Sequence, residues 1–180
     1  NGKPVYVWDG HEDEAVPADA GMVYLINCKN IQARGLSLEK NFLGMAVMNS
    51  EGISVRNISS NQNGIGFACI NSDNLSLSDS EIRGNQFLGI FCYRGSDLSV
   101  TSSLIADNQY ATMLMAEEAP DLVLWHNSFI NSAGGHLNLG AQASQSSPES
   151  ISYCYQDTYY RHSLGNYWDD YTGTDADGDG

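Results

Sequence analysis

The sequence predicts an all-β chain, a right-handed parallel β-helix of about five to six coils that is closed by a C-terminal hairpin and an aromatic cap. The first observation behind this prediction is a pattern that recurs every 22 to 24 residues between Gly21 and Gly135, a regularity typical of solenoids. The second is a two-residue alternation of apolar positions within each repeat, which indicates strands with one buried face. The third is composition, because 18 glycines, four prolines and few charged residues suit a turn-rich β-protein.

The length of 180 residues suits a single domain, residues 1–180. We expect a capping strand and an acidic loop in residues 1–20, the coils in residues 21–139, and a loop, a hairpin and an acidic tail in residues 140–180. The capping strand is predicted from "NGKPVYVW", where valines alternate with aromatic residues. The loop "GHEDE" at 10–14 is expected to be a solvated turn rather than a metal site.

Each coil is predicted to contain two alternating strands joined by a tight turn. The second strand begins at an apolar anchor and has another apolar residue two positions later. These pairs of positions are Ile31 and Ala33, Ile53 and Val55, Leu75 and Leu77, Leu98 and Val100, and Leu122 and Leu124. The first strand is expected to point inward at Val23 and Leu25, Met45 and Val47, Phe67 and Cys69, Ile90 and Cys92, and Leu114 and Ala116. Asn, Asp or Gly before each anchor tolerates the left-handed turn conformation.

A recurring asparagine marks another corner of each coil. The five residues are Asn41, Asn61, Asn85, Asn108 and Asn131. A small residue follows three or four positions later, at Gly44, Gly64, Gly89, Ala111 and Gly134. Because equivalent residues of neighbouring coils stack about 4.8 Å apart, the asparagines are predicted to form an amide ladder that satisfies buried turn backbone. The alternative is that they favour turns and stay exposed.

The cysteines are expected to be structural. Cys69 and Cys92 share one inward column, which favours small buried apolar residues over a ligand pair. A disulfide between them is the less favoured alternative, because side chains that point the same way from in-register strands meet the required dihedral poorly. Cys28 and Cys154 have no predicted partner, and His126, His136 and His162 show no metal-ligand spacing.

The end of the chain is predicted to close the solenoid. Residues 140–150 form a polar loop, and residues 151–160 alternate and turn as a hairpin does. The aromatic residues Tyr167, Trp168 and Tyr171 follow. Because the end of a solenoid exposes apolar core and unpaired strand, these residues are suited to cover it.

The net charge of −14, with only eight Lys and Arg, excludes nucleic acid as a partner and favours cations. Asp175, Asp177 and Asp179 alternate before Gly180, which resembles the first half of a calcium loop. Calcium is therefore a candidate ligand, with Asp169 or Asp170 to complete the shell, and an acidic tail without a ligand is the alternative. No apolar stretch is long enough to span a bilayer.

Two features indicate an extracytoplasmic protein. The triplets at Asn57 and Asn74 are glycosylation sequons, although such triplets often arise by chance. The chain opens at Asn1 without an initiating Met, which is expected of a mature or excised product.

The motif "GNYWDDYTGTDADGDG" closely resembles the end of NosD-like right-handed parallel β-helix domains, a family of archaeal cell-surface proteins often labelled periplasmic copper-binding. "NGKPVYVW" and "DAGMVYLINCKN" are similar to the start of the same module, so the resemblance covers essentially the whole chain. The resemblance implies an extracytoplasmic location and a right-handed helix. It also attaches copper handling, but no residues of this chain stand out to carry that role, so copper is not expected.

An apolar stripe is predicted on the outside of the coils. It comprises Tyr24, Ile26, Met48, Ile70, Phe91, Tyr93 and Met115. Exposed apolar patches of more than a few hundred Å² usually mark interfaces. We therefore expect a partner, either a second copy or another envelope protein, to cover the stripe. The alternative is cover by the chain's own tail or its 140–150 loop.

The function expected from the sequence is a non-catalytic module of the cell envelope, structural or self-associating. Polysaccharide cleavage is not expected, because the outward positions carry a single carboxylate, Glu117, where paired acids are required. A carbohydrate-binding role remains as an alternative, since Tyr24, Phe91 and Tyr93 could stack on sugars. The third alternative is copper handling.

Overall fold

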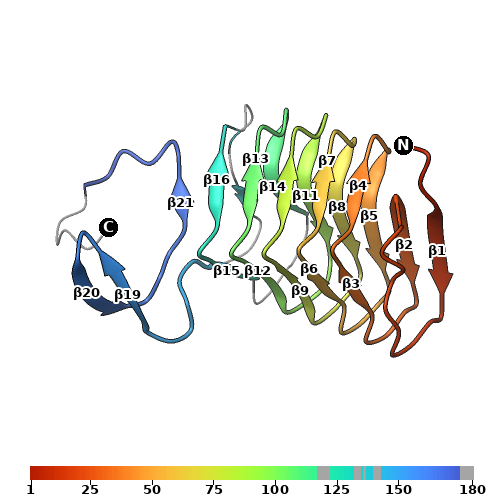
Figure 1. The fold of residues 1–180 in the computed structure, drawn as a ribbon, viewed down its shortest axis with the longest axis horizontal. Coiled ribbons are helices and arrows are strands. Elements are labelled where there is room, and N and C mark those ends of the chain that lie inside the picture. The colour runs from red at the N-terminus through yellow and green to blue at the C-terminus, as the bar shows by residue number, and fades with distance from the viewer. Residues whose placement is uncertain (117–121, 132–134, 136, 140–142, 175–180) are drawn as a thin grey trace.

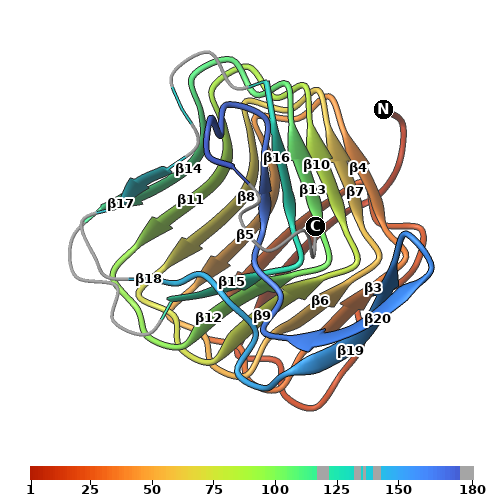
Figure 2. The same ribbon diagram turned by 90° about the vertical axis from the view of Figure 1, so that its left-hand side faces the viewer.

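The computed structural model describes residues 1–116, 122–131, 135, 137–139 and 143–174. The chain forms a parallel β-solenoid of about five turns with a C-terminal antiparallel hairpin, as the sequence predicts (Figure 1). Each full coil passes through three parallel sheets, which enclose the core on three sides (Figure 2). The third strand of each coil is three residues long in the first five copies, and the sequence pattern does not predict it.

We number the sheets in the order in which a coil visits them. The first sheet contains β1 (Val5–Asp9), β2 (Met22–Ile26), β5 (Leu43–Met48), β8 (Ile65–Ile70), β11 (Leu88–Tyr93), β14 (Ala111–Ala116) and β17 (Leu137–Leu139). The second contains β3 (Gln32–Arg34), β6 (Ser54–Arg56), β9 (Leu75–Ser78), β12 (Leu98–Thr101), β15 (Leu122–Trp125) and β18 (Ala143–Ser144). The third contains β4 (Ser37–Glu39), β7 (Ser59–Asn61), β10 (Glu81–Arg83), β13 (Leu104–Ala106), β16 (Ser128–Ile130) and β21 (Tyr167–Trp168). The hairpin pairs β19 (Ile151–Tyr155) with β20 (Thr158–His162).

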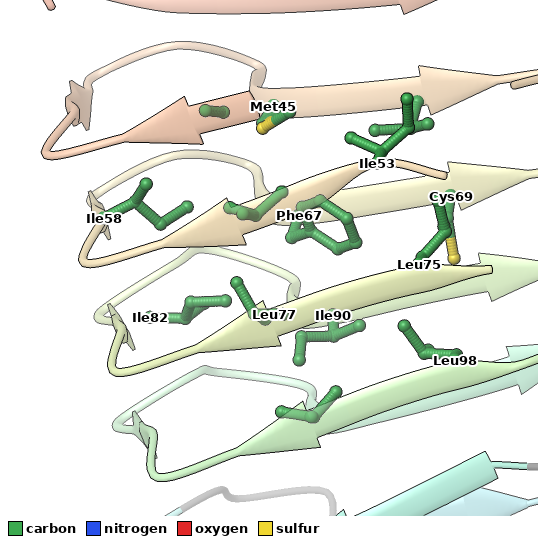
Figure 3. Packing of buried hydrophobic residues seen from close by; sticks show 14 of the residues in the cluster. Met45, Ile53, Ile58, Phe67, Cys69, Leu75, Leu77, Ile82, Ile90 and Leu98 are labelled. Carbon is green, nitrogen blue, oxygen red and sulfur yellow. The ribbon is translucent and has the colours of Figure 1, made fainter. Parts of the chain in front are cut away.

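The inward side chains of successive coils stack into one continuous apolar core. Met45, Phe67 and Ile90 occupy the same position in three neighbouring coils, and each is at most 1% exposed (Figure 3). All five anchor residues and the residues two positions after them are also buried. A side chain of this size stabilises the fold by about 1.5–3 kcal/mol when fully buried. Because each coil covers the apolar face of its neighbour, the stack and not the single coil is the stable unit.

In the fifth coil the inward positions lie one residue earlier than the repeat predicts. Met113 is fully buried, whereas Leu114 pairs with Phe91 and is half-buried. Met115 pairs with Cys92, a residue of an inward column, and not with Phe91 as the repeat predicts. The cause is the segment after β14, which is five residues long where the segment after β11 has four. Counting back from the next anchor across this longer segment shifts the register by one.

A disulfide between Cys69 and Cys92 joins β8 to β11 inside the core. The prediction of two buried thiols is therefore wrong, although both residues are buried as expected, each 4% exposed. The two residues face each other in register with their Cα atoms 4.7 Å apart, which lies within the range that disulfides bridge. Cys28 and Cys154 are free, the first buried and the second exposed.

Buried asparagines form an amide column at the corner between the third and first sheets. The members are Asn41, Asn63, Asn85 and Asn108, the last three of which are fully buried. The side-chain oxygen of each buried member accepts a hydrogen bond from the backbone N–H of the preceding member, at 3.0, 2.9 and 3.2 Å. Their amide nitrogens donate to carbonyl oxygens one coil earlier. The column thereby satisfies N–H groups of the turns and bonds carbonyl oxygens of the third-sheet strands β4, β7 and β10.

Two of the asparagines predicted for this column lie outside it. Ser60, not Ile58, pairs with Leu38, so the inward position of the second coil holds a buried serine. If the apolar Ile58 is taken as the inward residue, the repeat places Asn61 in the column. Asn61 instead lies on the third sheet and is half-buried. Asn131 is exposed after β16 and is also outside the column.

Hydroxyl groups take the same role at the other two corners. At the first corner the Ser50 hydroxyl accepts from the Cys28 N–H and the Ser72 hydroxyl accepts from the Ser50 N–H, at 2.9 and 3.1 Å. At the second corner Ser80 and Ser103 continue the pattern, with their hydroxyls accepting at 3.2 Å from the coil before. At each of the three corners, a column of small polar side chains therefore accepts hydrogen bonds from backbone N–H groups of the neighbouring coil.

The tail ends as a last partial coil on the third sheet. Asn166 accepts hydrogen bonds from both the N–H and the side-chain amide of Asn127, and β21 pairs with β16. Trp168 stacks on Phe129, with ring centroids 4.2 Å apart, and packs against the core. Among the predicted capping aromatics, Tyr167 and Tyr171 are exposed. At the other end of the solenoid, the β1 aromatics Tyr6 and Trp8 pack against the core.

Candidate interaction surface

The outward residues of the first sheet form an almost entirely apolar surface, which we call the outer face. Strand pairing aligns them in two columns that run along the solenoid. The first column contains Val7, Tyr24, Ala46, Ala68, Phe91 and Leu114, and its register continues to Asn138 on β17. The second contains Asp9, Ile26, Met48, Ile70 and Tyr93. A third row borders them at the start of the strands and contains Leu43, Ile65, Leu88 and Ala111.

Two buried alanines lie in the middle of the first column, with an aromatic residue on either side. Ala46 and Ala68 are 1% and 3% exposed although they belong to no buried core column. Both alanines are therefore covered, although they occupy an outward column. Tyr24 precedes the two alanines and Phe91 follows them in the same column, and both rings are half-buried. The six predicted stripe residues other than Met115 therefore share one surface.

Charge is confined to the margins of the outer face. In the two columns, as far as their residues are described, Asp9 at the N-terminal end is the one charged residue. The Arg94 guanidinium lies 5.1 Å from the ring centroid of Tyr93 and marks the border of the face. The geometry therefore separates an uncharged surface from the rest of an acidic chain with a net charge of −14.

Ion pairs occupy the other two sheets. The Arg56 guanidinium lies 2.8 Å from Asp79, and Arg83 lies 2.7 Å from Asp107 and 3.3 Å from Glu81. Hydrogen bonds from the Asn131 amide and then from Arg83 hold the pKa of Asp107 below its ordinary value. These pairs are solvent-exposed, so each contributes little to stability.

The described part of the tail does not lie over the outer face. Figure 2 shows the β19–β20 hairpin on the far side of the solenoid from β11, β14 and β17. Residues 143 and 144 belong to β18, which extends the second sheet. Of the 140–150 loop, residues 140–142 lie outside the described residues.

The predicted calcium ligands Asp175, Asp177 and Asp179 lie outside the described residues. Asp169 is engaged within the fold, because its carboxylate accepts a hydrogen bond of 2.6 Å from the Asn131 N–H. Asp170 is exposed, two residues after the end of β21. Of the two residues proposed to complete a calcium shell, Asp169 instead bonds the segment after β21 to the segment after β16.

Both sequon asparagines stand at exposed corners. Asn57 and Asn74 have φ angles of 52° and 54°, the left-handed conformation of the corner turns. Asn57 also lines an open groove of about 660 Å³ between the second and third sheets, beside Asp79 and Glu81. Since both of these carboxylates are held by arginines, the groove contains ion-paired acids.

The described residues do not fit a copper site. Cys69 and Cys92 are bonded to each other, and the Cys28 thiol donates to the carbonyl oxygens of Trp8 and Ile26, at 3.6 and 3.3 Å. In the described part of the chain no group of three or more His, Cys, Asp or Glu residues is placed to hold a metal ion.

Within the same described residues, no helix has the length and apolar character needed to cross a bilayer. Comparisons with curated proteins and with solved structures find no significant match. Residues 11–173 match the family described as "Periplasmic copper-binding protein (NosD)". The match spans nearly the whole solenoid and includes the "GNYWDD" segment of the cap. The chain is therefore a β-solenoid module that belongs to the NosD family.

Proposed function

We propose that this chain is a non-catalytic, extracytoplasmic interaction module that associates with a second copy of itself through the outer face. The observation that carries the proposal is the uncharged outer face of the first sheet, which the described tail leaves uncovered. Two findings support the location. The family is described as periplasmic, and the Cys69–Cys92 disulfide is of a kind that persists in oxidising compartments.

The area of the outer face suits a specific interface. Five strands about 4.8 Å apart, each with about six residues of about 3.3 Å, cover roughly 24 by 20 Å, or on the order of 500 Å². Two such faces together bury on the order of 1,000 Å², the lower bound for a specific protein–protein interface. Stacked sheets pack about 10 Å apart with interdigitating side chains, a geometry that two copies of the outer face can adopt.

Charge restricts where two copies can meet. Two chains that each carry a net charge of −14 repel one another over most of their surfaces. The outer face is the surface where two copies meet without bringing like charges together, and its two-column pattern is repeated on both. A two-fold arrangement pairs the same patch with itself, as in most soluble homodimers.

The arrangement favours binding over catalysis. Glycoside cleavage requires two carboxylates at the scissile bond, one of which acts as a general acid. The acids that line the groove between the second and third sheets, Asp79 and Glu81, are each paired with an arginine. Copper handling, the activity named for the family, lacks a described donor set in this chain.

The test is a pair of charge substitutions at the centre of the outer face, Ile70→Lys with Tyr93→Lys. These two residues are neighbours on β8 and β11. Because burying unpaired ammonium groups costs several kcal/mol, the dissociation constant should rise about a hundredfold or more. Sedimentation velocity over a range of concentrations measures it, and the β-sheet circular dichroism spectrum should be unchanged.

The matched control is Ser76→Lys with Ser99→Lys. These serines are also register neighbours, on β9 and β12 of the second sheet, and they point outward. The control should associate like the unmodified chain. The proposal is wrong if the unmodified chain remains monomeric up to high concentration, or if both double variants associate equally well.

A further inference from the structure

A row of exposed aromatic side chains follows the corner between the third and first sheets. Phe42, Phe87 and Tyr110 are 69%, 50% and 67% exposed. Gly64 occupies the same place in the coil between the two phenylalanines, because Ile65 and Phe87 donate their N–H groups to the carbonyl oxygens of Phe42 and Gly64. Tyr110 follows in the next coil, with its N–H on the carbonyl oxygen of Phe87. We call these three residues and Gly64 the corner row.

Gly64 leaves no side chain in the corner row between Phe42 and Phe87. A Cβ atom at position 64 would lie 2.6 Å from the Phe42 carbonyl oxygen and 3.2 Å from Cδ2 of the Phe42 ring. The Phe42 ring therefore lies against the bare backbone of the next coil. Three coil steps of about 4.8 Å give the row a length of roughly 14 Å along the solenoid axis.

Amide side chains accompany the rings. Two of the coils contain an extra residue next to the ring, and in both it is an exposed glutamine, Gln86 and Gln109. Gln62 is exposed at the corner of the coil between Phe42 and Phe87. Each amide offers two donors and an acceptor. The segments that form the row, 41–43, 63–65, 85–88 and 108–111, contain no charged residue, and the position before them holds Lys40, Gln62, Gly84 and Asp107 in successive coils.

We propose that the corner row binds an extended neutral polysaccharide whose chain lies parallel to the solenoid axis. Flat aromatic faces pack against the C–H faces of pyranose rings, while exposed amides bond the ring hydroxyls. The repeat of the coils presents a ring or a flat glycine at every step, which suits a polymer with a repeat of similar length. The net charge of −14 disfavours acidic polymers. This binding is independent of association through the outer face.

The test uses affinity gel electrophoresis with soluble β-glucan, mannan and galactan, and with polygalacturonate as the acidic counterpart. At least one neutral polymer should retard the unmodified chain, and polygalacturonate should not. Phe87→Ala should weaken this retardation on the order of tenfold, as expected for a central aromatic contact. The triple change Phe42→Ala, Phe87→Ala and Tyr110→Ala should abolish it.

Two controls separate this site from others. Tyr159→Ala removes an aromatic ring that is 84% exposed on the hairpin and should leave retardation unchanged. The outer-face variant Ile70→Lys with Tyr93→Lys should still be retarded by the neutral polymer. The inference is overturned if no neutral polymer retards the chain, or if the triple variant is retarded as before. It is also overturned if the triple variant loses self-association instead, because the row then belongs to the protein interface.

Discussion

At the scale of single residues, the tightest requirement lies beneath the asparagine column. Gly44, Gly66 and Gly89 occupy one position in three successive coils, at the start of the first sheet. A Cβ atom at any of them would collide with the carbonyl oxygen of the next coil and with a buried asparagine amide. Glycine is needed here for close approach and not for an unusual φ angle. The asparagine column and the glycine column therefore depend on each other.

Gly66→Ala tests this dependence. The added methyl would lie 2.5 Å from Ile82 Cγ2 and 2.8 Å from both Asn85 Nδ2 and the Gly89 carbonyl oxygen. Because the contacts are with buried atoms that cannot move freely, the free energy of unfolding should fall by about 1–3 kcal/mol. Urea denaturation measures it. Gly165→Ala is the control, since its nearest contact is 3.6 Å away, and an equal loss in both variants would contradict the close-approach explanation.

The sequence predicts the existence of the asparagine column but not every member. "NQN" at 61–63 offers two asparagines two residues apart, and both suit a turn. The choice depends on whether Ile58 or Ser60 is the inward residue. Ser60 is inward because its hydroxyl bonds the Gly66 carbonyl oxygen and accepts from the Asn63 amide. A buried serine satisfied in this way resembles a surface residue in the sequence, so hydropathy alone misplaces it.

At the scale of strands, the disulfide is the one covalent link between coils among the described residues. It joins β8 to β11 across a sequence separation of 23 residues. Strand pairing alone predicts that Cys69 and Cys92 face each other, but periodicity cannot distinguish two packed thiols from a bond. The same limit applies to β14, where one residue more in a connecting segment moves Met113 into the core.

Reduction of this disulfide should destabilise the solenoid. A closed loop of this length restricts the unfolded chain, so the oxidised protein should be more stable by about 3 kcal/mol. Thermal unfolding with and without dithiothreitol, in a Cys154→Ser background that prevents exchange through the exposed thiol, measures the difference. Thiol titration of the unfolded, unreduced original chain should count two thiols. A count of four, together with identical unfolding curves, would show that the bond does not form.

At the scale of the whole molecule, the solenoid is closed by a segment distant in sequence. Asn166 and Asn127 are 39 residues apart, whereas the coils from β2 to β16 follow one another at spacings of 22 to 24 residues. The intervening loop and hairpin therefore form an excursion from the last coil, after which the chain returns to pair with β16. The sequence predicts an aromatic cap from composition. It does not predict that the cap adds one more rung, because the repeat is interrupted.

Trp168→Ala tests how the cap stabilises the stack. Trp168 covers the end of the core by stacking on Phe129, but it is itself only half-buried. The expected loss is therefore about 2–3 kcal/mol, below the range for a fully buried aromatic residue. Tyr167→Ala, at the adjacent position that is 59% exposed, should cost little.

Because each coil contacts only its neighbours, the loss of stability in Trp168→Ala should be local at first. Hydrogen exchange should become faster in β15 and β16 while β5 and β8 keep their protection. Equal acceleration in all coils would show that the solenoid unfolds as one cooperative unit and that its cap stabilises every coil alike.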